Sequence, residues 1–146
     1  MASETIQLEV VMSTTAQSTV GILLITVPLV VWGGYSLLYF LTRATPGYLD
    51  NPMRRSMFTA GHAHAGVLVL FALVTVPYVA LAGLGEPWST VVRLMLVAPP
   101  ILMPLGFFLS VASPRAKRPN ALLWLVYLGA ASLFAATLTL GIGLLV

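Results

Sequence analysis

TVGILLITVPLVVWGGYSLLYFL, residues 19–41, is a run of 23 residues without a charged side chain. About 20 consecutive apolar residues suffice to carry a helix across the hydrocarbon core of a bilayer. Three further apolar runs follow, at residues 57–82, 91–112 and 121–146. The sequence therefore predicts an all-α integral membrane protein, a four-helix bundle that forms one transmembrane domain over residues 1–146.

The composition agrees with this class of protein. Hydrophobic residues make up 59% of the chain and charged residues 8%, whereas a soluble domain carries about 25% charged residues. Four spans leave no room for a separate soluble domain. The chain has no cysteine, which excludes disulfides, thiolate metal sites and cysteine nucleophiles. Residues 1–17 contain Glu4 and Glu9 but no Lys or Arg, so they lack the positive region of a signal peptide, and we expect the first span to be retained.

The basic residues outside the spans gather in two loops, 42–56 and 113–120. They are Arg43, Arg54, Arg55, Arg115, Lys117 and Arg118. The loop between spans two and three contains Glu86 instead. Because excess Lys and Arg stay on the cytoplasmic side, we expect a multi-pass protein of the cell membrane with both basic loops in the cytoplasm and both termini outside.

Helix breakers and small residues mark two of the spans. Pro99, Pro100 and Pro104 are expected to kink or unwind the third span, since proline removes a helical hydrogen bond. Small residues at four-residue spacing, Gly61/Ala65 and Ser132/Ala136, indicate packing faces of spans two and four. These faces would serve either the monomer or an oligomer.

Both histidines of the chain, His62 and His64, lie in the sixth and eighth positions of the run 57–82. Ionisable groups at membrane depth are rare and suggest function, and no Asp or Glu lies inside any of the four runs. A neutral imidazole bound to a metal or a haem iron is therefore a natural state. Residues two apart on a helix lie about 200° apart, so a straight helix directs only one histidine at a given metal. The alternative is an interfacial role, in which an imidazole bonds to water or a carbonyl.

The half of the bundle next to the basic loops gathers polar and aromatic side chains from all four spans. They are Trp32, Tyr35, Tyr39, His62, His64, Phe107, Phe108, Ser110, Asn120, Trp124 and Tyr127. Tyr39, Asn120 and Trp124 lie near span ends, as expected of an interfacial belt. Tyr35 and Tyr127 lie deeper, and they are candidate catalytic residues that would donate a hydrogen bond to a substrate oxygen.

The segment Ala63-His64-Ala65-Gly66 resembles the Ala-His-Ser-Gly segment of membrane-bound styrene oxide isomerases. The preceding Asn51-Pro52-Met53-Arg54-Arg55 is similar to the Asn-Pro-Arg loop of hydroxylaminobenzene mutases. The isomerase resemblance implies a trimer of four-span subunits, with His64 as the metal ligand of a haem b. His62 is a second candidate cofactor-binding residue. The resemblance also implies an isomerase whose haem iron acts as a Lewis acid on a small apolar oxygen-containing substrate. One departure is Leu70, which stands where the isomerase segment has an asparagine.

Two other functions compete with this interpretation. Short loops and small-residue helix faces suit an accessory or assembly subunit of a larger, respiratory membrane complex. The three prolines of the third span would suit a small transporter, but no charged residue lies at the membrane midplane and no inverted repeat is evident.

Overall fold

The computed structural model describes residues 14–146, and within them it confirms an all-α, multi-pass membrane protein. The helices are α1 (Thr14–Thr42), α2 (Pro52–Thr75), the 3₁₀ helix η1 (Val76–Leu81), α3 (Trp88–Val97), α4 (Pro99–Ser110), the 3₁₀ turn η2 (Ala121–Leu123) and α5 (Trp124–Leu145). Four segments of this described part are long and apolar enough to cross a bilayer: Thr15–Thr42, Pro52–Leu81, Trp88–Ser110 and Ala121–Leu145.

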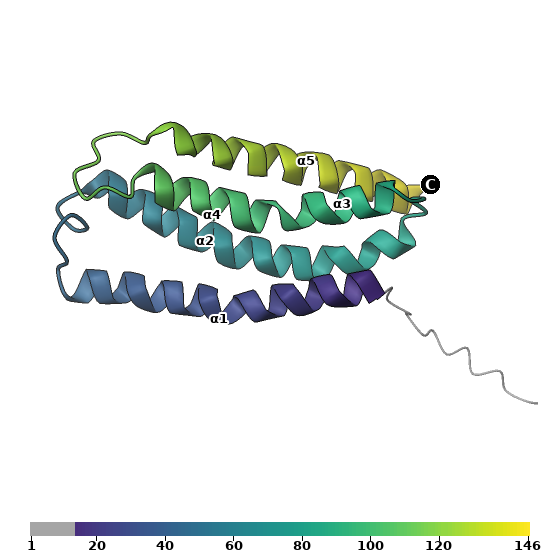
Figure 1. Ribbon diagram of the computed structural model, residues 1–146, viewed down its shortest axis with the longest axis horizontal. Helices are drawn as coiled ribbons and strands as arrows, with labels where there is room; N and C mark the ends of the chain where they lie inside the picture. The colour runs from purple at the N-terminus through teal and green to yellow at the C-terminus, as the bar shows by residue number, and fades with distance from the viewer. Residues whose placement is uncertain (1–13) are drawn as a thin grey trace, which may run out of the picture.

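The four spans lie side by side as a row rather than as a closed square (Figure 1). Helix α2 packs between α1 and α4, and α4 packs between α2 and α5. Among the described helices, α1 packs on α2 and η1 alone. At the end away from the basic loops, η1 contacts α1, α3 and α5. The helices are therefore packed more closely together at this end than at the other.

The buried core lies at this more closely packed end. It joins Leu23 of α1, Ala72 of α2 and Leu96 of α3 to Val76 and Val79 of η1. Ala136 and Leu140 of α5 complete it. The half that contains the histidines is packed largely by aromatic rings, and it also buries Met103 and Val111.

Helix α2 begins at Pro52, five residues earlier than the expected span. The prediction that 42–56 is wholly a loop is therefore wrong. The side chain of Asn51 accepts a hydrogen bond from the Arg54 backbone N–H at 3.1 Å and caps the helix, with Pro52 in the first turn, where a missing N–H costs nothing. The Asn51 amide also donates to the carbonyls of Pro114 and Ala116 at 3.1 and 2.9 Å. The Asn-Pro pair thus starts the helix and ties the two basic loops together.

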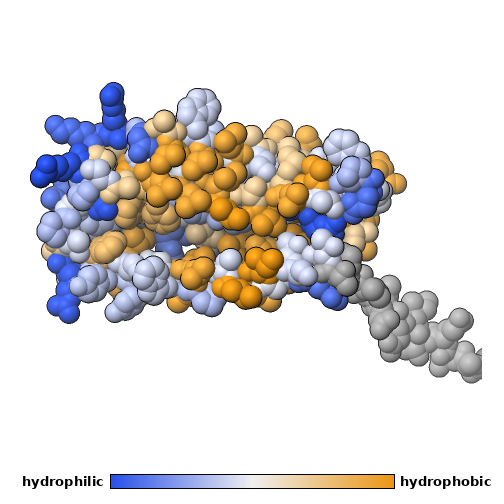
Figure 2. Space-filling model, viewed as in Figure 1, coloured by the Kyte–Doolittle hydropathy of each residue, from blue (hydrophilic) through white to orange (hydrophobic). Residues whose placement is uncertain are grey.

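Arg54 has a structural role as well as a charge. Its guanidinium donates to the carbonyls of Gly47 (2.9 Å) and Val111 (3.2 Å) and lies 4.4 Å from the centre of the Phe58 ring. The other basic side chains of the two loops are exposed. Figure 2 shows hydrophilic residues concentrated at this end and an apolar band over the middle of the bundle.

The third span breaks where its prolines predict. Helix α3 ends at Val97 and α4 begins at Pro99. Pro99 has no N–H to donate to the carbonyl of Met95, four residues earlier. The hydroxyl of Ser132 on α5 donates to that carbonyl instead, at 2.9 Å. A neighbouring span therefore satisfies the backbone group that the proline leaves open, as membrane helices require.

Candidate functional site in the histidine layer

His62 points from α2 towards α1 and rests on a pair of glycines. A Cβ added to Gly34 would lie 3.0 Å from His62 Nε2, and one added to Gly33 would lie 3.6 Å from Nδ1. Any larger residue at Gly34 would press on the imidazole. Helix α1 is continuous through this pair, so the glycines make a seat for the ring rather than a break in the helix.

His62 also closes one end of a cavity of about 260 Å³ between α1, α2 and the α3–α4 junction. Ala65 and Val69 of α2 lie on its floor, and Pro100 and Ile101 line the opposite wall. Figure 2 shows the face of the molecule hollowed between α1 and its neighbours. Neither nitrogen of His62 has a hydrogen-bond partner within residues 14–146. The cavity therefore holds an imidazole with its polar atoms available.

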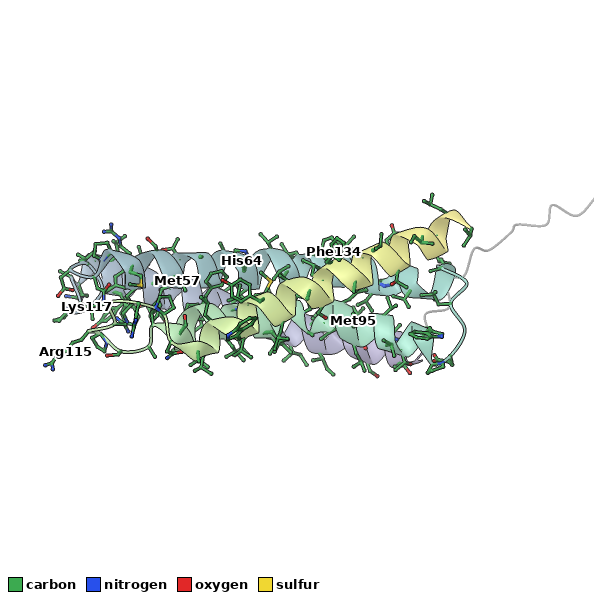
Figure 3. The ribbon with its side chains drawn as sticks, turned by 90° about the horizontal axis from the view of Figure 1, so that it is seen from above. Met57, His64, Met95, Arg115, Lys117 and Phe134 are labelled. Atoms are coloured by element: carbon green, nitrogen blue, oxygen red, sulfur yellow. The ribbon has the colours of Figure 1, made fainter. Side chains whose placement is uncertain are left out.

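His64 lies on the other side of α2, against α4. Its Nδ1 is 2.7 Å from the Ala60 carbonyl oxygen, and its ring centre is 4.9 Å from that of Phe107. A carbonyl only accepts, so Nδ1 carries the proton and Nε2 of the neutral ring has a free lone pair. Figure 3 shows His64 between Met57, nearer the basic loops, and the level of Phe134 and Met95.

The two histidines therefore lie in separate environments, His62 against α1 and His64 against α4, as their spacing predicts. Among residues 14–146, no group of three or more His, Cys, Asp or Glu side chains could hold a metal ion. A metal here would depend on one imidazole plus ligands that are not protein carboxylates or thiolates. His64 would be the residue to hold a metal or a haem, because an Nδ1–H bonded to a backbone carbonyl fixes the ring and leaves Nε2 free.

The predicted catalytic tyrosines lie elsewhere. Tyr35 on α1 is 66% exposed and Tyr127 on α5 is 56% exposed, and their helices do not contact each other. Tyr127 packs edge-on against Trp124, with ring centres 5.4 Å apart. Within one copy of the chain, neither tyrosine joins His62 or His64 in a common pocket, and both belong to the outward, lipid-facing surface.

Two features of this layer escaped prediction. Tyr48, in the first basic loop, is buried, and its ring lies 5.7 Å from Phe40 and 6.2 Å from Phe58. Phe58 in turn packs edge-on against Phe108 at 5.3 Å. Loop residues are normally exposed, so only the aromatic character of Tyr48 hinted at burial. The second feature is the seat that Gly33 and Gly34 make for the His62 ring.

The small residues of span two also find their partners inside the monomer. A Cβ on Gly61 would lie 3.0 Å from Phe107 Cβ and 3.2 Å from the Phe108 ring. Gly61 thus admits the aromatic side chains of α4. On α5, Ala136 is buried and Ser132 bonds to Met95. Gly61, Ser132 and Ala136 are therefore used in packing within one chain, whereas Ala65 lines the cavity beside His62.

At the opposite end, Arg93 is buried and forms an ion pair with exposed Glu86, at 3.4 Å between Nη2 and Oε1. The same nitrogen donates to the hydroxyls of Ser89 and Thr90 at 3.4 and 3.3 Å. Ser89 also donates to Glu86. Hydrogen bonds from Ser89 and then Thr90 lower the pKa of the Glu86 carboxyl below its ordinary value of 4.5, and Arg93 adds a smaller electrostatic contribution. This cluster closes the turn between η1 and α3.

Comparison of the chain with family models, with curated proteins and with solved structures gave no match.

Proposed function

We propose that the protein is an intramembrane haem-binding protein in which His64 would hold a haem b. The observation that carries this proposal is the 2.7 Å contact from His64 Nδ1 to the Ala60 carbonyl. It orients the ring and directs the lone pair of Nε2 away from its own helix. Phe107, 4.9 Å away between ring centres, limits rotation of the imidazole.

The surroundings of His64 suggest where a haem would lie. The His64 side chain is half-buried, so the imidazole is reachable from the outer surface of the bundle. A haem bonded there would extend beyond the helices of one copy, and a second copy would cover it. We therefore propose a homo-oligomer, and the isomerase resemblance favours a trimer. Neighbouring copies would also bring the outward-facing Tyr35 or Tyr127 towards a bound substrate.

The reaction that we propose is the isomerisation of a small apolar oxygen-containing substrate. When bound, haem would supply a Lewis-acidic iron that polarises the substrate oxygen. No carboxylate lies within the described spans to act as a general base, which agrees with a reaction that needs none. The apolar bundle would admit the substrate from the lipid phase.

The absorption spectrum of the protein, purified in mild detergent with and without added haem, tests the proposal. We expect a Soret band that His64→Ala abolishes and that the matched variant His62→Ala retains. A protein without this band, even after haem supplementation, would exclude haem binding. A Soret band that survives His64→Ala would show that His64 is not the haem ligand. Stoichiometric membrane-protein partners in place of a homo-oligomer would favour the accessory-subunit hypothesis.

We also propose that the basic end faces the cytoplasm of a cell membrane, with both termini outside. The positive charge of loops 42–56 and 113–120 supports this orientation. Because the chain has no cysteine, a single cysteine introduced at Lys117 or at Gly85 reports the sidedness of each end. In intact cells, a membrane-impermeant maleimide should label the Gly85 variant only, and the reverse pattern would invert the topology.

A further inference from the structure

The cavity beside His62 is a second site, distinct from the surroundings of His64. It is bounded by α1 on one side and by the α3–α4 junction on the other, with α2 as its floor. The backbone of α1 does not come close to that of α3 or α4, and the space between these helices reaches the outer surface of the bundle. Leu29, which lines the cavity and is 67% exposed, stands at this opening.

The size of the cavity limits its occupant. A volume of about 260 Å³ gives room for about nine groups of the size of a water molecule, at about 30 Å³ each. This volume lies just below the range of about 300–1,000 Å³ that is usual for drug-sized ligands, so the cavity suits a small ligand. A molecule the size of a short-chain alcohol or a substituted phenol fits.

The lining excludes charged ligands. No Asp, Glu, Lys or Arg contributes to it, and an ion without a partner is costly in an apolar environment. The polar side chains that line it are His62 and Thr26. The Thr26 hydroxyl donates its proton to the Leu23 carbonyl at 2.6 Å, which leaves its oxygen as an acceptor only.

The helix break at this wall adds a further acceptor. The carbonyl of Val97 has no helical donor, because Pro100 has no N–H and the N–H of Ile101 donates to Ala98 instead, at 3.1 Å. Val97 lines the cavity. In transporters, unwound carbonyls of this kind contribute to binding sites.

We infer that this cavity binds a small neutral alcohol or phenol from the lipid phase, with the hydroxyl group at His62 and the apolar part towards Ile22 and Ile101. A neutral imidazole offers one donor and one acceptor, whereas the Thr26 hydroxyl and the Val97 carbonyl offer acceptors only. Acceptors are therefore in excess, and a ligand that brings an O–H donor satisfies more of them than an ether or a ketone does. This inference does not depend on haem at His64.

Photolabelling of the full chain in detergent micelles with a diazirine-bearing octanol tests the inference. We expect adducts, mapped by peptide mass spectrometry, to concentrate on residues 22–33 and 97–101. Octanol should compete about tenfold better than its isomer dibutyl ether at equal micellar concentration, as one hydrogen bond implies. His62→Phe keeps a ring of similar size, and it should remove most of this preference for the alcohol.

Two further variants keep the test decisive if His62→Phe fails to fold. Leu29→Trp should block the opening and reduce labelling, whereas Leu24→Trp is a matched control. Leu24 is exposed on the same helix and does not line the cavity. Adducts spread evenly over the lipid-facing surface, or equal competition by octanol and dibutyl ether, would overturn the inference. So would a Leu29→Trp protein that is labelled as strongly as the Leu24→Trp control.

Discussion

The contribution to stability of the hydrogen bond from Ser132 to the Met95 carbonyl should depend on the presence of Pro99. We predict that Ser132→Ala destabilises the wild-type protein by about 1–1.5 kcal/mol, in the upper part of the range for hydrogen bonds between membrane helices. The reason is that Pro99 has no N–H, so loss of the Ser132 hydroxyl leaves the Met95 carbonyl without a donor. Replacing the proline should supply one.

In a Pro99→Ala background, the same Ser132→Ala change should cost about 0.5 kcal/mol or less. Ala98 already has helical dihedral angles, φ −63° and ψ −43°, so an N–H at position 99 would point at the Met95 carbonyl. The double-mutant cycle should therefore give a coupling of about 1 kcal/mol. Loss of the buried proline ring affects both arms of the cycle and cancels.

Equilibrium unfolding in mixed micelles of sodium dodecyl sulfate and a nonionic detergent, followed by circular dichroism, measures the four free energies. Thr137→Val is a suitable control, because the Thr137 hydroxyl donates within its own helix, to Leu133 at 2.8 Å. It should show no coupling to Pro99→Ala. If Ser132→Ala costs the same in both backgrounds, the idea that this serine replaces the missing helical donor is wrong.

Three further predictions concern packing, capping and pH. Gly106→Ala should destabilise the protein by about 1–3 kcal/mol despite the better helix propensity of alanine. Its Cβ would lie 2.8 Å from a backbone nitrogen of α5. Gly21→Ala, with no atom within 4 Å, should be neutral or stabilising in the same unfolding assay. Asn51→Ala should cost about 1–2 kcal/mol and increase proteolysis of both basic loops. The pKa of Glu86 is lowered, chiefly by the hydrogen bond from Ser89. Its stabilising contribution should therefore be complete above about pH 4.5 and be lost as pH falls through the lower, folded-state pKa, and Glu86→Gln should remove this part of the pH dependence of unfolding.

The number of spans was predictable because length and hydropathy are properties of a single segment. The start of α2 was not, because Arg54 and Arg55 look like loop residues. The Arg54 guanidinium bonds to backbone carbonyls and lies over the Phe58 ring. Arg54 can therefore lie within the first turn of α2, which begins at Pro52. This local solution depends on loops that are far apart in sequence.

The candidate site was predictable in part for a similar reason. Helix periodicity alone places His62 and His64 on opposite faces, and the structure agrees. It does not say which neighbour each face meets, because that depends on the order of the helices in the row. The position of Tyr35 and Tyr127 in the sequence predicted their depth in the membrane, but not which way their helix faces point. In the structure, both side chains point outward from the bundle.

The row of spans also bears on how the protein is made. Each span packs on the span that precedes it in the chain: α2 on α1, α4 on α2, and α5 on α4 and α3. A chain that leaves the ribosome in this order can dock every new helix on one already in the membrane. None has to wait for a partner not yet synthesised, so assembly during translation needs only contacts between successive segments, the kind that forms fastest.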